Sequence, residues 1–107
     1  MSNNKDEQND NITVAQFRLD SAFQLTGRDF FLLGQITKGV IKQGEYMDLT
    51  MLGLNKKPKI KAVEFARRQQ DGKVWEGIGL ETDELSEDEK EFIKNQGSLS
   101  IPFDIII

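Results

Sequence analysis

The 107-residue sequence contains no cysteine and no histidine, and these two absences exclude much of enzyme chemistry. Without them the chain cannot bind zinc through thiolate or imidazole groups, build a Cys–His or Ser–His nucleophile, or use imidazole as a proton shuttle. Any catalysis would have to rely on carboxylates or lysines. We therefore expect a protein that is not an enzyme, with no metal site and no cofactor.

Long apolar runs are also missing from the sequence. No apolar segment approaches the ~20 residues that a membrane-spanning helix needs. The first eleven residues, MSNNKDEQNDN, contain no apolar stretch of the kind found in a secretory signal. Together with the absence of cysteine, these features favour a cytoplasmic protein that makes no membrane contact.

Acidic residues outnumber basic ones, and the formal net charge is −4. This balance argues against a general nucleic-acid binder, because such binding depends largely on neutralising phosphates. The first eleven residues are too polar to bury any surface, so we expect a disordered tail over 1–11. The rest of the chain has the length and composition of a single folded domain, over 12–107.

Four glycines divide the stretch TGRDFFLLGQITKGVIKQG, residues 26–44, into short apolar runs. Each occupies a position where a tight turn or a close backbone approach favours a residue without Cβ. The stretch therefore predicts turn, strand, turn, strand. The expected structural turn and bend positions are Gly27, Arg28, Gly34, Gly39 and Gly44.

Apolar and polar residues alternate in several short segments, as in half-buried strands. The expected strands cover residues 12–25, 30–41, 46–52, 59–65, 74–80 and 101–107. Pro102 restricts the last of them to an edge or to a strand start. This pattern predicts an all-β fold, and a small closed barrel is favoured because closure hides strand edges.

One helix is expected, near the C-terminus. Within residues 81–91, Ser86 is followed three positions later by Glu89, which is the signature of a capping box. Lys94 lies near the expected end, and Gly97 follows it. The helix should be one to three turns long.

A basic segment is the main candidate for binding a phosphate or an acidic partner. Between residues 56 and 68 there are six cations and one acid, Glu64; the cations are Lys56, Lys57, Lys59, Lys61, Arg67 and Arg68. The alternative interpretation is a solvated strand face, since no aromatic residues are interleaved with these cations. Residues 81–91 carry seven acids, and the two segments could attract each other within the fold or between copies.

Residues 17–102 resemble the second domain of translational GTPases such as elongation factor Tu. The matching positions are Phe23, Gly27–Arg28, Gly34, the run KGVIKQG at 38–44, and residues 63–65, 78–80 and 93–97. The resemblance implies a six-stranded antiparallel β-barrel of the translation-factor domain II type. The G-x-x-x-x-G-K-[ST] loop of the GTPase domain is absent, so we expect a barrel that stands alone and binds no nucleotide.

In elongation factor Tu this domain helps to hold the aminoacyl end of tRNA. By resemblance, Asp20 and Ser21 stand where the family has a carboxylate pair, Phe23 and Arg67 are kept, and Gly77 replaces an asparagine. The resemblance therefore implies a groove near Asp20, Phe23 and Arg67 that is related to this pocket but altered in half of its positions.

The expected function is a non-enzymatic interaction module that docks a protein or a ribonucleoprotein. RNA binding is left open, and a steep salt dependence would reveal it. The alternative is a structural adaptor unrelated to translation, which forms homo-oligomers through the apolar strand over 103–107.

Overall fold

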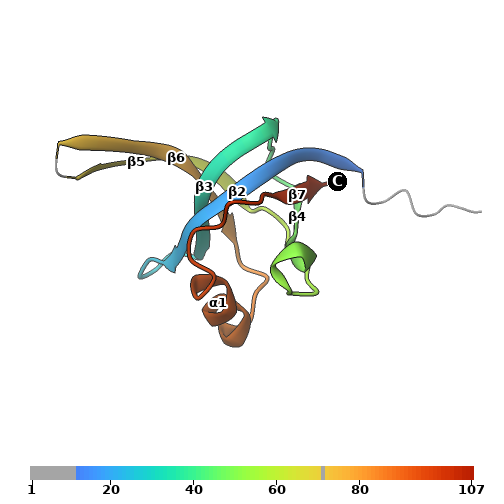
Figure 1. Cartoon of the computed structure of the whole chain (residues 1–107). Coiled ribbons are helices and arrows are strands. Elements are labelled where there is room, and N and C mark those ends of the chain that lie inside the picture. The colour runs from blue at the N-terminus through green and yellow to red at the C-terminus, as the bar shows by residue number, and fades with distance from the viewer. Residues whose placement is uncertain (1–11, 71) are drawn as a thin grey trace, which may run out of the picture.

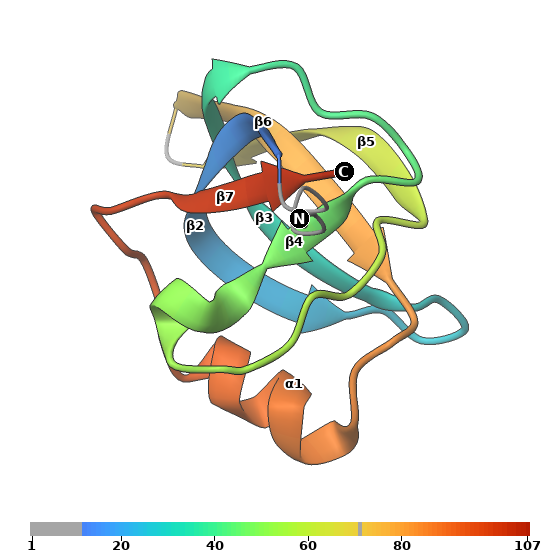
Figure 2. The ribbon, with the colours of Figure 1, turned by 90° about the vertical axis from the view of Figure 1, so that its right-hand side faces the viewer.

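The computed structural model describes residues 12–70 and 72–107, apart from the side chains of residues 68, 70 and 75. The fold is one six-stranded antiparallel sheet with the strand order β4-β7-β2-β3-β6-β5, and the sheet curls around a single core (Figures 1 and 2). Its strands are β2 (Thr13–Gln24), β3 (Phe30–Gly39), β4 (Tyr46–Asp48), β5 (Ala62–Gln70), β6 (Lys73–Thr82) and β7 (Phe103–Ile106). The expected all-β class with six antiparallel strands is confirmed.

The sheet forms a curled half-barrel, so the expectation of a fully closed barrel needs correction. Its two ends meet only over a short stretch, where residues 58–60 run beside the start of β4. The Met47 N–H donates to the Pro58 carbonyl at 2.9 Å, and the Ile60 N–H donates to the Glu45 carbonyl at 2.8 Å. The barrel does not close beyond this point. Strand β5 pairs along its whole length with β6, and the two form a long hairpin.

The core fills the concave side of the sheet. Its fully buried side chains come from all parts of the chain: Phe17, Leu19, Phe30, Leu32, Met47, Leu49, Ile60, Leu80, Ile93, Phe103 and Ile105. Helix α1 (Glu87–Lys94) lies across one end of the curled sheet and buries Ile93 (Figure 2). Apolar burial of this kind is the main stabilising contribution to such a fold.

Two of the expected glycine positions are places where backbones approach closely. A Cβ on Gly34 would overlap the backbone carbonyl of Arg18, and one on Gly39 would overlap the carbonyl of Val14. Gly39 also has a φ of +77°, which L side chains rarely adopt. Both glycines allow the backbone of β3 to approach that of its paired neighbour β2 closely, and such a close backbone approach is one of the two uses that the sequence predicted for them.

The expected strand over residues 46–52 is wrong in its second half. Strand β4 ends at Asp48, and a 3₁₀ helix, η2 (Leu49–Leu52), follows. The Asp48 carboxylate accepts hydrogen bonds from the Thr50 N–H at 3.2 Å and from the Thr50 hydroxyl at 2.6 Å. Such local side-chain bonds compete with strand pairing, and here they start a helical turn.

The capping box predicted for the helix is present in full. The Ser86 side chain accepts from the Glu89 N–H at 3.2 Å, and the Glu89 carboxylate accepts from the Ser86 N–H at 2.8 Å. The helix begins at Glu87 rather than Glu81, because residues 81 and 82 still pair with β3 as the end of β6. Within residues 12–70 and 72–107, no helix is long and apolar enough to cross a membrane.

Strand β7 lies inside the sheet, between β4 and β2, and Pro102 immediately precedes it. Both of its edges are therefore hydrogen-bonded within the fold. Phe103, Ile105 and Ile106 are buried. The apolar C-terminal segment thus contributes to the core, and its edges are already occupied by neighbouring strands.

Candidate functional site

The cations of the predicted basic segment lie beside acidic side chains of the same molecule. The Lys56 Nζ is 3.6 Å from a Glu89 oxygen, and the Lys61 Nζ pairs with Asp29 and lies 3.7 Å from Asp83. The hydrogen bond from Lys61 to Asp29 is the main cause that raises the pKa of Lys61. Much of the positive charge is therefore balanced within the fold.

Backbone contacts strengthen the same attraction between the basic segment and residues 81–91. The Lys59 N–H donates to the Glu84 carboxylate at 2.8 Å, and the Lys61 N–H donates to the Glu81 carbonyl at 2.7 Å. The Lys59 ammonium lies 5.8 Å from the centre of the Tyr46 ring. Lys57 is exposed. The attraction between the two segments that the sequence suggested occurs within one chain.

Arg28, expected as part of the first turn, binds two carboxylates on the convex face of the sheet. Its Nη2 lies 2.6 Å from a Glu64 oxygen and 3.5 Å from a Glu81 oxygen, and its guanidinium stands 5.0 Å from the centre of the Phe31 ring. The hydrogen bond to Glu64 is the main cause that raises the pKa of Arg28. This geometry gives Arg28 a structural role, joining the first turn to β5 and β6.

The residues related by resemblance to the aminoacyl-end pocket are spread over the sheet. Phe23 stacks on Phe31 with ring centroids 5.8 Å apart, whereas Asp20 lies 3.8 Å from Arg18. Arg67 pairs with Glu76 on the β5–β6 hairpin at 3.6 Å. Strand alternation puts Phe23 and Arg67 on opposite faces of the sheet.

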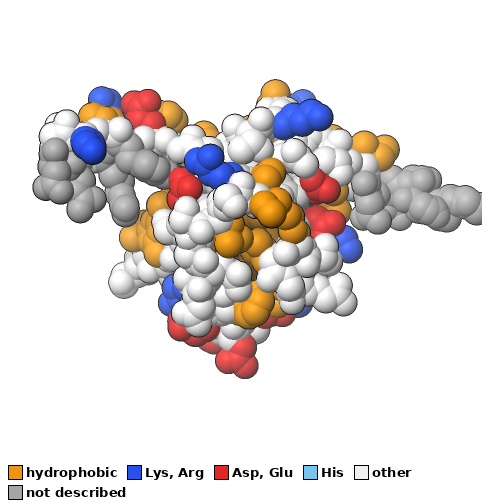
Figure 3. Space-filling model, in the orientation of Figure 1, with side chains coloured by type: hydrophobic (Ala, Val, Ile, Leu, Met, Phe, Trp, Pro, Cys, Tyr) orange, Lys and Arg blue, Asp and Glu red, His pale blue; other side chains and the backbone are white. Residues whose placement is uncertain are grey.

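A groove that the sequence analysis did not predict lies between η2 and the segment that leads into β7. Two hollows of about 400 Å³ and about 200 Å³ share Met51 and Ile101 in their walls. Met51 is 47% exposed and Ile101 is 61% exposed. Hydrophobic side chains gather on this face of the molecule (Figure 3). We call this feature the Met51–Ile101 groove.

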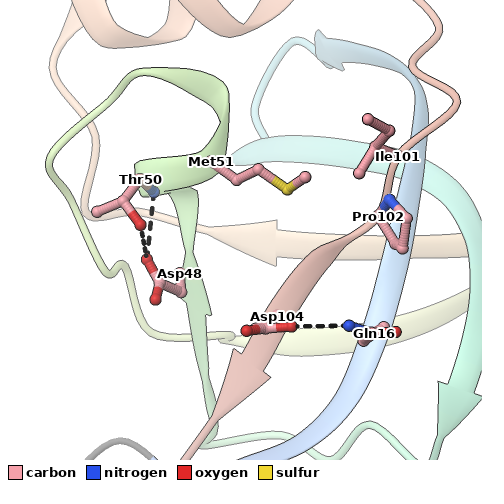
Figure 4. Close-up of a pocket in the computed structure, with 7 residues that line it drawn as sticks. All are labelled: Gln16, Asp48, Thr50, Met51, Ile101, Pro102 and Asp104. Carbon is pink, nitrogen blue, oxygen red and sulfur yellow. Dashed lines mark hydrogen bonds between the residues drawn. The ribbon is translucent and has the colours of Figure 1, made fainter.

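The larger hollow combines an apolar rim with acidic groups. Met51 points across it toward Ile101 and Pro102, and Asp48 and Asp104 lie along another side (Figure 4). Asp48 and Asp104 are directly opposite each other in the pairing of β4 with β7. Such opposed positions place two side chains on the same face with Cβ atoms about 4.5–5.5 Å apart.

The bonds that these two carboxylates make within the described part of the chain go to neutral groups. Asp104 accepts from the Gln16 amide at 3.0 Å, and Asp48 accepts from Thr50. The groove can therefore receive an apolar group at its rim and a positive charge at its acidic side. Within residues 12–70 and 72–107, no group of three or more ligating side chains could hold a metal ion.

Sequence reasoning missed this groove because its residues come from three distant parts of the chain, namely Gln16, residues 48–52 and residues 96–104. Asp48 and Asp104 come together only through the pairing of β4 with β7. The sequence offered one signal, the two apolar residues Met51 and Ile101, each next to one polar residue and near one end of an expected strand. That signal did not distinguish an exposed position from a buried one.

No protein-family model matches the chain, and no solved structure matches it significantly. The likeness to domain II of translational GTPases therefore depends on the glycine spacing and on the matching residues between 17 and 102.

Proposed function

We propose that this protein is a non-enzymatic interaction module related to domain II of the translation factors, and that it docks a protein partner in the Met51–Ile101 groove. One observation carries the proposal: exposed apolar side chains border a hollow whose side holds two acidic residues, Asp48 and Asp104, at paired positions of β4 and β7. Grooves that combine apolar walls with a few convergent polar groups are the usual form of a binding site.

The occupant is a partner segment in which a lysine or arginine stands next to an apolar residue. Like charges directly opposite each other on paired strands destabilise a sheet. A cation placed between Asp48 and Asp104 would relieve that repulsion, and its apolar neighbour would bury the exposed surface of Met51 and Ile101. Charge-assisted hydrogen bonds to carboxylates are among the stronger polar contacts in interfaces.

A protein partner is favoured over RNA for this site. The two carboxylates of the groove repel phosphate, and several cations of the basic segment already pair with acids of the chain. Nucleic-acid binding depends on cations that are available to phosphates. A ribonucleoprotein could still be docked through one of its proteins.

The direct test is an NMR titration of the ¹⁵N-labelled full chain with three probes. The first is a short peptide that contains lysine next to leucine, the second has glutamate in place of that lysine, and the third is a single-stranded RNA oligonucleotide. The first probe alone should shift the amide signals of Met51, Ile101 and Asp104. Binding should weaken with added salt, because a charge pair contributes to it.

Two variants make this test specific to the groove. Met51→Ser should weaken the binding of the lysine–leucine peptide, whereas Val40→Ser, at a site that is 66% exposed outside the groove, should not. Equal shifts with the lysine and glutamate peptides would contradict the acidic part of the proposal. Shifts confined to residues 56–68 with the RNA probe would overturn it in favour of RNA binding.

A further inference from the structure

The hairpin of β5 and β6 projects from the body of the molecule as an arm (Figure 1). Strand β3 pairs with β6 only from Gly34↔Ile78 to Phe30↔Thr82, so residues 66–70 and 73–77 pair with each other alone. We call these two stretches the arm. Isolated two-stranded hairpins are marginally stable, so an arm of this length gains from pairing with a further strand.

Strand β5 is the last strand in the sheet order, and its outer edge is open. In the described part of the chain, β6 is the only segment to which backbone hydrogen bonds join β5. Alternate N–H and C=O groups of an edge strand point outward and offer a template for another strand. The open edge extends over the nine residues Ala62–Gln70.

Two exposed apolar side chains, Phe65 and Val74, flank the ion pair of Arg67 and Glu76 on one face of the β5–β6 hairpin. Strand alternation puts Phe65 and Val74 on the same face as Val63 and Leu80, which pack in the core. Phe65 is 68% exposed and Val74 is 48% exposed. The core-facing side of the sheet thus continues onto the arm, where no described residue covers it.

We propose that β5 pairs antiparallel with β5 of a second copy of this chain, around a twofold axis at Ala66. Ala66 is the middle of the strand, so this register pairs all nine residues of the open edge. It places Phe65 directly opposite Arg67 of the second copy, on the same face, and the symmetry repeats this contact. The two sheets become one continuous sheet of twelve strands.

The occupant is a second copy because this edge is complementary to itself. Arg67 lies on the exposed face of the arm and keeps 65% of its side chain exposed beside Glu76. A guanidinium over an aromatic ring is attractive, and the symmetric register creates two such contacts at once. An unrelated extended peptide would form hydrogen bonds with the open backbone groups. It would not in general place a guanidinium opposite Phe65 and an aromatic ring opposite Arg67.

Disulfide mapping tests the register, and the absence of native cysteine makes it unambiguous. In the proposed dimer the Ala66 Cα atoms of the two copies are about 4.5–5.5 Å apart, within the range of a disulfide. Ala66→Cys should therefore link to itself under mild oxidation. Gln69→Cys should not, since its two copies would be about 20 Å apart, but a mixture with Val63→Cys should give the mixed dimer.

Sedimentation equilibrium of the cysteine-free chain tests the association itself. Wild type should show a monomer–dimer equilibrium, and Phe65→Lys should weaken it about tenfold or more, because lysine would then oppose arginine. The matched control is Val74→Lys, which changes an exposed residue on the same face but on β6. A wild type that stays monomeric at all concentrations, or a Gln69→Cys chain that links to itself as readily as Ala66→Cys, overturns the proposal.

The arm and the Met51–Ile101 groove share no residue. Dimerisation can therefore fail while the groove still binds its peptide, and the reverse also holds, so the two proposals are tested separately.

Discussion

Asp48 and Asp104 stand directly opposite each other on β4 and β7, and their described hydrogen bonds go to the uncharged groups of Thr50 and Gln16. Like charges at opposed positions of paired strands generally lower the stability of a sheet, so we expect this pair to lower the stability of the free protein. The same repulsion favours a ligand that brings a positive charge. The pair therefore links the stability of the sheet to the occupancy of the Met51–Ile101 groove.

Replacing one of the two aspartates should separate their effect on the stability of the free protein from their effect on ligand binding. Asp104→Asn keeps an oxygen that can accept from Gln16 but removes one charge, so it should stabilise the free protein by about 0.2–1 kcal/mol. The same change should weaken binding of the lysine–leucine peptide. Urea unfolding and NMR titration measure the two quantities.

The control for this prediction is Asp20→Asn, which removes a carboxylate that lies near Arg18 on the surface. It should change stability by less than about 0.5 kcal/mol and leave peptide binding unchanged. A destabilised Asp104→Asn chain would show that the carboxylate pair is not repulsive in the folded protein.

Gly34 should be one of the least tolerant positions in the chain. A Cβ there would overlap the Arg18 carbonyl, which belongs to the backbone and cannot move independently of β2. Gly34→Ala should cost about 3 kcal/mol in the free energy of unfolding. Gly27→Ala is the comparison, because Gly27 has a φ of +77° but open space around it, and it should cost about 1 kcal/mol. Similar values for both variants would argue against the close approach of the β2 and β3 backbones at Gly34.

Replacing Arg28 should lower the stability of the fold, because the Glu81 carboxylate would lose an ion-pair partner. Glu81 keeps only 9% of its side chain exposed and lies 3.5 Å from the guanidinium. Arg28→Ala should therefore destabilise the fold, because the Glu81 carboxylate would keep only the hydrogen bond that it accepts from the Asp29 N–H at 3.3 Å. Chemical denaturation provides the measurement.

A second substitution tests whether the unpaired charge of Glu81 causes the loss of stability. Adding Glu81→Gln to Arg28→Ala should recover part of the lost stability, because the remaining group is no longer charged. Arg18→Ala, whose partner Asp20 is 3.8 Å away, should have an effect below about 1 kcal/mol. If the double variant is less stable than Arg28→Ala, the loss comes from the contact of Arg28 with Phe31 instead.

The capping box should make stability depend on pH in the acid range. The hydrogen bond from the Ser86 backbone lowers the pKa of Glu89, and Lys56 lowers it further. Because the pKa of Glu89 is lower in the folded state, its stabilising effect is fully present above the unfolded value of about 4.3. The effect is lost as the pH falls through the folded pKa.

Glu89→Gln should therefore lower stability near pH 7 by about 0.5–1 kcal/mol, and the difference from wild type should shrink below about pH 4. Urea unfolding between pH 7 and pH 3 measures this difference. Glu91→Gln is the control, because it removes an exposed partner of Lys94 in the same helix and should change stability near pH 7 by less than about 0.5 kcal/mol. A constant difference for Glu89→Gln at all pH values would contradict the role of its charge.

Local sequence determined much of the fold. The capping box of Ser86 and Glu89 predicted the helix, because its two hydrogen bonds lie within four residues and need no distant partner. The glycines at 34 and 39 predicted a tight turn or a close backbone approach, and the structure shows the close approach, which requires a residue without Cβ. Alternation predicted most strands, but it failed after Asp48, where a side-chain bond to Thr50 starts η2.

Only the tertiary structure decided which surfaces are available for binding. The net charge of the basic segment was visible in the sequence, but its pairing with residues 81–91 depends on how the strands and α1 pack. The apolar C-terminal segment forms β7, which lies inside the sheet, whereas β5 forms one edge of the sheet. Strand order, the opposed pair Asp48 and Asp104, and the groove beside them all arise from contacts between distant segments, which local sequence patterns do not encode.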